Sequence, residues 1–124
     1  MYLKSYKEFT VWQRAMELAT EVCRLTRLLP KFETYGLADQ MRRAAVSIPS
    51  NISEGQGRIS AKEFIHFLGI ARGSQNELET QLLLCENLGY LKPEDTATAL
   101  NLCTEVSKML NVLIKKIRIS LDSP

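Results

Sequence analysis

Basic and polar side chains recur at helical spacing through the middle of the chain. Steps of three or four residues place side chains on one face of an α-helix, where amides, hydroxyls and guanidinium groups can bind phosphates. The pattern predicts a surface for nucleic acid or a ribonucleoprotein, formed by Arg42, Arg43, Arg58, Lys62 and Arg72. One helical stripe consists of Gln40, Arg43, Ser47, Asn51, Glu54 and Arg58, and a shorter one of Arg72, Asn76 and Glu79.

The same stripes have a second interpretation, in which the polar groups bind one another. Buried polar groups need hydrogen-bond partners, and stripes with both signs of charge suit mutual pairing. We expect such pairs between Arg43 and Glu54 and between Arg72 and Glu79. The interleaving of acids with bases favours this network over the phosphate-binding surface. The network, between helices or between subunits, would comprise Gln40, Ser47, Asn51, Glu54, Asn76 and Glu79.

Groups for metal binding or catalysis are sparse. Glu63 and His66 have the Glu-x-x-His spacing of di-metal sites in helical bundles, but such a site needs a second copy and the chain has one histidine. No nucleophile–base pair, glycine-rich phosphate loop or catalytic carboxylate pair is recognisable. We therefore expect no enzymatic activity, no metal and no cofactor. The remaining enzymatic alternative is a site at a subunit junction, built from Arg43, Asn51 and Glu54.

Length and composition fit one ordinary domain. The 124 residues are 45% hydrophobic and 24% charged, with a net charge of +2. We expect a single domain over residues 1–124, with its core at about residues 9–118. No segment approaches the roughly 20 apolar residues of a membrane span, and residues 1–8 lack the apolar part of a secretory signal. Cys23, Cys85 and Cys103 suit buried, reduced thiols, so we expect a cytoplasmic protein with no membrane partner.

Four helical segments must position these side chains. Apolar residues at steps of three or four predict helices over about residues 9–29, 33–56 and 60–88, and from residue 93 onward. Pro30 ends the first, Ser60 and Glu63 form a capping box that begins the third, and Pro93 opens the fourth. No segment alternates like a strand. Short connections make successive helices antiparallel, so the sequence predicts an all-α, up-down-up-down four-helix bundle.

Pro49 lies inside the second predicted helix. Proline removes one backbone hydrogen bond there and clashes with the carbonyl of Ala45. The apolar register nevertheless continues from Ile48 to Ile52. We therefore expect one helix with a kink near Pro49, which the glycines of residues 55–57 then stop.

The first and fourth predicted helices carry more apolar surface than a lone bundle needs. The first has two adjacent apolar stripes, and the fourth adds Met109, Val112 and Ile114 to its main stripe. The surplus predicts that a neighbouring subunit covers part of this surface. Lys115 and Lys116 are interpreted as a complement to the dipole at the C-terminal end of the fourth helix.

A long motif in the middle of the chain resembles one family. It runs from Glu33 to Leu37 (ETYGL) and from Gln40 to Gly55 (QMRRAAVSIPSNISEG), and continues in residues 64–74 and 77–81. Residues 11–15 (VWQRA) fit the family's first helix. These residues are similar to the 23S rRNA-intervening-sequence proteins, a four-helix-bundle family related in fold to the accessory proteins of diversity-generating retroelements. The resemblance covers about residues 9–115.

The resemblance carries expectations about assembly and partners. It implies a bacterial protein that forms a homo-oligomeric ring, with a pentamer as the expected form, and that partners RNA, DNA or a ribonucleoprotein. The leading hypothesis is a non-enzymatic oligomer that binds RNA or a ribonucleoprotein through basic helix faces. The alternative is a protein-interaction scaffold or accessory subunit, for example of a reverse transcriptase, without direct contact to nucleic acid.

Overall fold

Helices account for all the regular structure of the described part of the chain. The computed structural model describes residues 5–122 and has no strand within them. This confirms the predicted all-α class. The helices are the 3₁₀ turns η1 (Tyr6–Glu8) and η2 (Lys31–Glu33), and α1 (Thr10–Thr26), α2 (Leu37–Gln56), α3 (Ala61–Asn87) and α4 (Pro93–Asp122).

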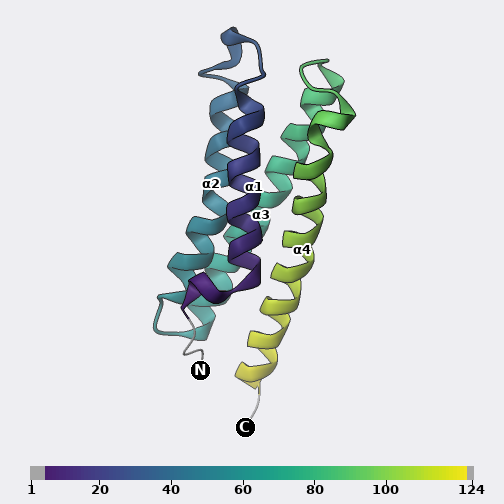
Figure 1. Ribbon diagram of the computed structural model, residues 1–124. Coiled ribbons are helices and arrows are strands. Elements are labelled where there is room, and N and C mark those ends of the chain that lie inside the picture. Colours follow the sequence, from purple (N-terminus) through teal and green to yellow (C-terminus); the bar gives the residue numbers. More distant parts are fainter. Residues whose placement is uncertain (1–4, 123–124) are drawn as a thin grey trace.

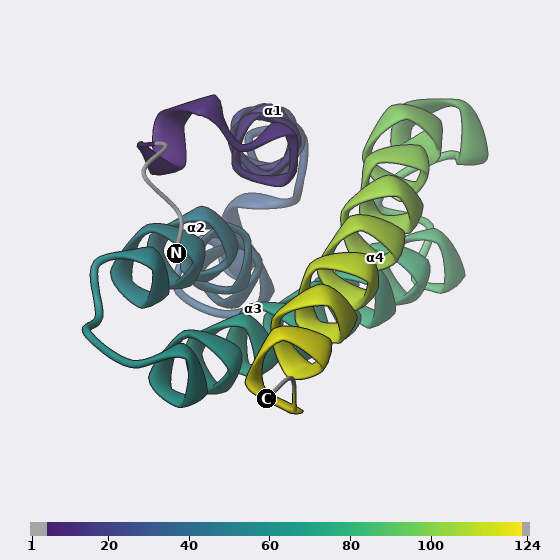
Figure 2. The same cartoon turned by 90° about the horizontal axis from the view of Figure 1, so that it is seen from below.

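Successive α-helices run in alternating directions along the bundle (Figure 1). Each packs against its two neighbours: α1 on α2 and α4, and α3 on α2 and α4. The diagonal pairs make no close backbone approach within the described residues. Seen from one end, α1 and α2 are foreshortened, while α4 runs obliquely beside them and in front of α3 (Figure 2). The arrangement is the expected four-helix bundle, with α4 inclined to the α1–α2 pair.

One hydrophobic core runs through the bundle, because the apolar stripe of each helix faces inward. Leu18 and Leu25 enter it from α1, and Ile48 and Ile52 from α2. Burying a side chain of this size contributes roughly 1.5–3 kcal/mol relative to leaving it exposed. The other large, fully buried residues are Phe64, Leu68, Leu78 and Leu82 of α3, Leu110 and Ile117 of α4, Met41 and Gln75.

The third helix begins at the predicted cap. Ser60 has extended backbone geometry, and its hydroxyl accepts a hydrogen bond from the backbone N–H of Glu63 at 3.1 Å. The carboxylate of Glu63 lies 3.4 Å from the Ser60 hydroxyl, where the capping box predicted a bond to the backbone N–H of Ser60. At the other end Gly89 adopts φ +76°, a left-handed conformation that favours glycine, and closes α3.

The second helix passes through Pro49 without interruption, as predicted. It ends at Gln56, but Gly55 lies inside it and is buried. Gly57, which follows the helix, has ordinary right-handed geometry. The conformational freedom of glycine is therefore not what ends α2, and the kink near Pro49 stays a prediction.

The first connection is longer than predicted, because α1 ends at Thr26 and α2 begins only at Leu37. The carboxylate of Glu33 accepts a hydrogen bond from the backbone N–H of Leu37 at 3.1 Å and so caps α2 from the preceding turn. Glu33 therefore belongs to the connection, whereas the sequence predicted that it lies at the start of the second helix.

No helix within residues 5–122 is both long and apolar enough to cross a membrane.

Candidate nucleic-acid interface

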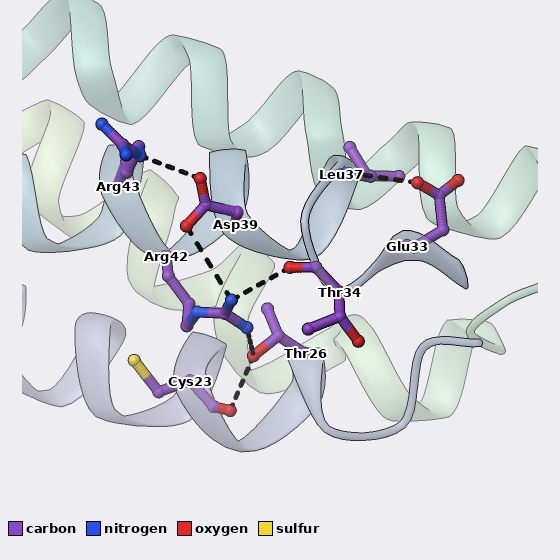
Figure 3. A network of polar contacts seen from close by, with 8 residues as sticks. All are labelled: Cys23, Thr26, Glu33, Thr34, Leu37, Asp39, Arg42 and Arg43. Carbon is purple, nitrogen blue, oxygen red and sulfur yellow. Dashed lines mark hydrogen bonds and ion pairs between the residues drawn. The ribbon is translucent and has the colours of Figure 1, made fainter. Parts of the chain in front are cut away.

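Arg42 holds the end of α1, the first connection and α2 together (Figure 3). Its guanidinium group donates to the hydroxyl of Thr26 at 3.4 Å and to the backbone carbonyl of Thr34 at 3.2 Å, and lies 3.9 Å from the carboxylate of Asp39. The Thr26 hydroxyl in turn donates to the carbonyl of Cys23 at 2.8 Å. Arg42 was predicted to bind phosphates, but these contacts give it a structural role.

Arg43 and Arg58 form ion pairs along α2 and its end. Arg43 donates to Asp39 at 2.9 Å, and Arg58 lies 3.3 Å from Glu54 and over the ring of Phe67. Within the described chain, Arg43 does not pair with Glu54. Eleven residues separate them, about 16 Å along a helix, whereas the observed partners are four residues apart.

Part of the predicted polar network exists between α2 and α3. The hydroxyls of Ser47 and Ser74 are 2.8 Å apart, and the amide of Asn51 donates to the carbonyl of Ser47 at 2.7 Å and to its hydroxyl at 2.9 Å. Ser74 belongs to the network although the sequence analysis did not include it. Gln40 is exposed, and its side chain bonds to no other described residue.

The remaining predicted members of the network, Asn76 and Glu79, lie further along α3. Asn76 is exposed, and its backbone carbonyl accepts a bond from the Thr80 hydroxyl. Glu79 is half-buried near Cys103. Burial, with a smaller contribution from Glu79, raises the pKa of the Cys103 thiol to about 12. Neither side chain joins the Ser47 network.

Arg72 reaches across to α4 and not along α3. It donates to the side-chain oxygen of Asn111 at 3.0 Å, and within the described chain it does not pair with Glu79. Two helical turns, about 10 Å, separate Arg72 from Glu79. Asn111 belongs to a helical stripe on α4 whose other members are Lys108, Lys115 and Arg118, at steps of three and four residues.

We name this surface the α3/α4 face: Arg72, Lys108, Asn111, Lys115 and Arg118. All five side chains are exposed. None of its four cations forms an ion pair within residues 5–122, whereas Arg14, Arg24, Arg42, Arg43 and Arg58 all do. Four unpaired cations therefore lie together on α3 and α4, apart from the α2 arginines Arg42 and Arg43, which are paired.

The helix-dipole interpretation of Lys115 and Lys116 is wrong. The structure extends α4 to Asp122, and its last turn contains no basic residue. A helix dipole acts mainly on the terminal turn, and both lysines lie further inside. The steps from 108 to 111, 115 and 118 were the sequence signal for a basic stripe.

Lys62 lies in the first turn of α3, at the same end of the bundle as Arg118 (Figure 1). It is exposed and forms no ion pair with a described residue. Of the five predicted phosphate-binding residues, Lys62 and Arg72 are thus free of acidic partners. Arg42, Arg43 and Arg58 are occupied within the chain.

The remaining chemistry-bearing residues lie apart from one another. His66 is exposed, with its ring edge-on to Phe67 at 5.6 Å between centroids. Within residues 5–122 no three metal-ligating side chains converge. Cys85 is buried as predicted, and burial raises its pKa to about 11. Cys23, which the sequence predicted to be buried, is only half-buried, because it lines a shallow surface groove with Thr20 and Arg27.

The geometry defines an antiparallel four-helix bundle with one basic face across two neighbouring helices, whose four cations form no ion pair with a described residue. The sequence profile of the 23S rRNA-intervening sequence proteins matches residues 7–112, and the chain belongs to this family. A crystal structure of a protein of unknown function from the S23 ribosomal protein family of Bacteroides thetaiotaomicron is 30% identical, with a TM-score of 0.80. The match covers 86% of this chain and 99% of that one. A comparison with curated proteins gave no match.

Proposed function

We propose that this protein is a non-enzymatic homo-oligomer that binds RNA, free or in a ribonucleoprotein, through the α3/α4 face together with Lys62. The observation that carries the proposal is the absence of acidic partners for Arg72, Lys108, Lys115 and Arg118 within the described residues. The name of the family, 23S rRNA-intervening sequence protein, is consistent with an RNA ligand.

The arrangement of the face suits a phosphate backbone. Cations that already pair with a carboxylate must give up that partner before they bind a phosphate, whereas unpaired ones release only water and counterions. The hydrogen bond from Arg72 to the neutral Asn111 leaves the charge of the guanidinium uncompensated while fixing its position. Contacts of this kind position a nucleic acid without reading its bases.

Exposed apolar surface supports the oligomer. Met16 and Val46 are about half-exposed and border a groove between α1 and α2, lined also by Trp12, Pro49 and Ser53. A second groove, of about 620 Å³, lies between the start of α1 and α4. Two different apolar surfaces on one subunit suit head-to-tail contacts, which close into a ring. A cytoplasmic pentamer of this kind is part of the proposal.

RNA binding is tested with two matched double variants. K108Q/K115Q and R43Q/R58Q each remove two positive charges, but only the first pair lies on the α3/α4 face. In filter binding with structured RNA at about 50 mM salt, we expect K108Q/K115Q to weaken binding at least tenfold and R43Q/R58Q to change it little. The reverse order would return the interface to the α2 stripe, and no retention of RNA by the wild type would refute the proposal.

The second groove favours an alternative function, that of a protein-interaction scaffold or accessory subunit. Its lining includes apolar side chains (Phe9, Val11, Met109 and Leu113) and two exposed lysines, Lys108 and Lys116. Such a groove can hold an amphipathic helix of a partner protein. This alternative would be selected by two results together. The wild type would retain no RNA, and it would still co-purify with a co-expressed reverse transcriptase after nuclease treatment.

A further inference from the structure

The connection between α1 and α2 presents three large apolar side chains to solvent. The exposed fractions are 53% for Leu28, 78% for Phe32 and 95% for Tyr35. Two aromatic rings this exposed, three residues apart in one turn, do not contribute to the core. Exposed apolar side chains that are grouped in this way mark an interaction site more often than isolated ones do.

Phe32 is held in place although it is exposed. The hydroxyl of Tyr90, in the turn between α3 and α4, donates to the carboxylate of Glu33 at 2.9 Å. The ring of Tyr90 meets that of Phe32 edge-on, with 6.2 Å between centroids and 76° between planes. Glu33 is itself fixed by its bond to the N–H of Leu37. A ring fixed in this way loses little conformational entropy when a ligand stacks on it.

Basic side chains are frequent in and next to this connection. Residues 24–43 contain five basic and two acidic side chains, a net charge of +3 in a chain whose total is +2. Arg27 and Lys31 flank Leu28 and Phe32, are exposed, and form no ion pair with a described residue. The connection therefore combines exposed aromatic faces with unpaired cations.

We propose that this end of the bundle binds unpaired nucleotides of a single-stranded RNA segment. Bases stack on Phe32 and Tyr35, and the adjoining phosphates lie against Arg27 and Lys31. The inference rests on the proposed RNA-binding function and adds the kind of RNA recognised. A lipid surface would suit these cations too, but stable binding to a bilayer needs a wider apolar face than three side chains provide.

We name the end of the bundle that carries Leu28, Phe32 and Tyr35 the aromatic end. It is separate from the α3/α4 face, so the two surfaces can be tested independently. Figure 1 shows the α1–α2 connection at the end of the bundle opposite the C-terminal end of α4, which carries Lys115 and Arg118. Loss of one surface leaves the other intact. Duplex RNA, whose bases are already stacked, would engage only the basic face.

The test compares F32A/Y35A with I59A. Ile59 is 98% exposed in the turn between α2 and α3, at the other end of the bundle, so I59A controls for the loss of an exposed apolar side chain. With a single-stranded oligonucleotide of about 12 nucleotides, we expect F32A/Y35A to weaken binding about tenfold per ring. F32Y/Y35F, which keeps both rings, should bind as the wild type does, and duplex RNA should bind all of these proteins equally.

Four outcomes decide the matter. The expected loss in F32A/Y35A alone supports the aromatic end. Equal single-strand binding by F32A/Y35A and I59A overturns it and leaves the α3/α4 proposal standing. If F32A/Y35A loses single-strand binding but K108Q/K115Q binds RNA as the wild type does, the α3/α4 proposal is refuted and the aromatic-end proposal stands. If F32A/Y35A binds RNA normally but no longer floats with vesicles of phosphatidylglycerol and phosphatidylcholine that the wild type binds, the ligand is lipid and the inference is wrong.

Discussion

Gly55 of α2 lies directly against Phe67 of α3. A β-carbon added to Gly55 would stand 2.7 Å from the β-carbon of Phe67 and 3.0 Å from the ring of Phe64. Real β-carbons essentially never approach so closely, so any larger residue forces the two helices apart. A β-carbon added to Gly73, in the middle of α3, would have no described atom within 4 Å apart from its chain neighbours and the nearby backbone of its own helix.

We therefore expect opposite effects when each glycine is replaced by alanine. Gly55→Ala should lower the free energy of unfolding by about 1–3 kcal/mol through overpacking. Gly73→Ala should raise it by up to about 1 kcal/mol, because alanine is the better helix former and meets nothing within the subunit. Urea unfolding measures both. Equal losses would show that Gly73 also contacts a helix, and in that case one from another subunit.

Replacement of Arg42 should destabilise the fold more than replacement of its neighbour. Arg42→Gln removes the bonds to Thr26 and Thr34 and should cost about 1 kcal/mol. The side chain of Arg43 is 79% exposed and forms one ion pair, with Asp39. Arg43→Gln should therefore lower the free energy of unfolding by less than about 0.5 kcal/mol. Thermal unfolding of the two variants gives the comparison. A larger effect for Arg43→Gln would contradict the structural role of Arg42.

Gln75 is a polar residue inside the core. Its side-chain oxygen is buried and accepts no hydrogen bond from a described residue. An unpaired buried oxygen is destabilising, so Gln75→Met should raise the free energy of unfolding by about 1 kcal/mol. The control Gln40→Met, at an exposed position, should change it by less than about 0.5 kcal/mol. A destabilised Gln75→Met would show that the hydrogen bond of Gln75 with the Cys103 thiol contributes more than the unpaired oxygen costs.

The three cysteines should differ in reactivity. At pH 8, alkylation with iodoacetamide should modify the half-buried Cys23 first and leave Cys85 and Cys103 intact, because both are buried and their pKa values lie near 11 and 12. Mass spectrometry of the peptides reads out the sites. In urea all three should react. Labelling of Cys103 as fast as Cys23 in the native protein would show that the core opens.

The same thiols make stability depend on pH. Their pKa values in the fold exceed the ordinary value of 9.0, so the unfolded chain ionises first as pH rises. The contribution of these two buried thiols to the free energy of unfolding is complete below pH 9 and falls as the pH rises toward 11 and 12. Urea unfolding at pH 8 and pH 10 should show a loss that is smaller in Cys103→Ala. An identical loss in that variant would assign the effect to other groups.

Salt should weaken RNA binding steeply if the α3/α4 face binds phosphates. A plot of log affinity against log salt concentration has a slope set by the number of phosphates neutralised. We expect K108Q/K115Q to reduce that slope by about one for each lysine. F32A/Y35A should lower affinity without changing the slope, because stacking releases no counterions. A slope unchanged in K108Q/K115Q would remove these lysines from the interface.

The candidate site was predicted only in part. Spacing correctly placed Ser47 and Asn51 on one face, but it paired Arg43 with Glu54 and omitted Ser74. Partners within a helix follow from three- and four-residue steps. Partners on another helix depend on how far each helix is turned toward its neighbour, which no single segment encodes. The bond from Arg72 to Asn111, 39 residues later, is of this second kind.

The sequence by itself determined the four helices, the direction in which each faces the core, the capping of α3 at Ser60 and the family. These depend on local periodicity and on residues that are neighbours in the chain. Only the tertiary structure decided which cations lack partners, that Gly55 serves close packing, and that Tyr90 supports Phe32 through Glu33. Each of these depends on distances between segments far apart in sequence, which packing fixes once the helices have formed.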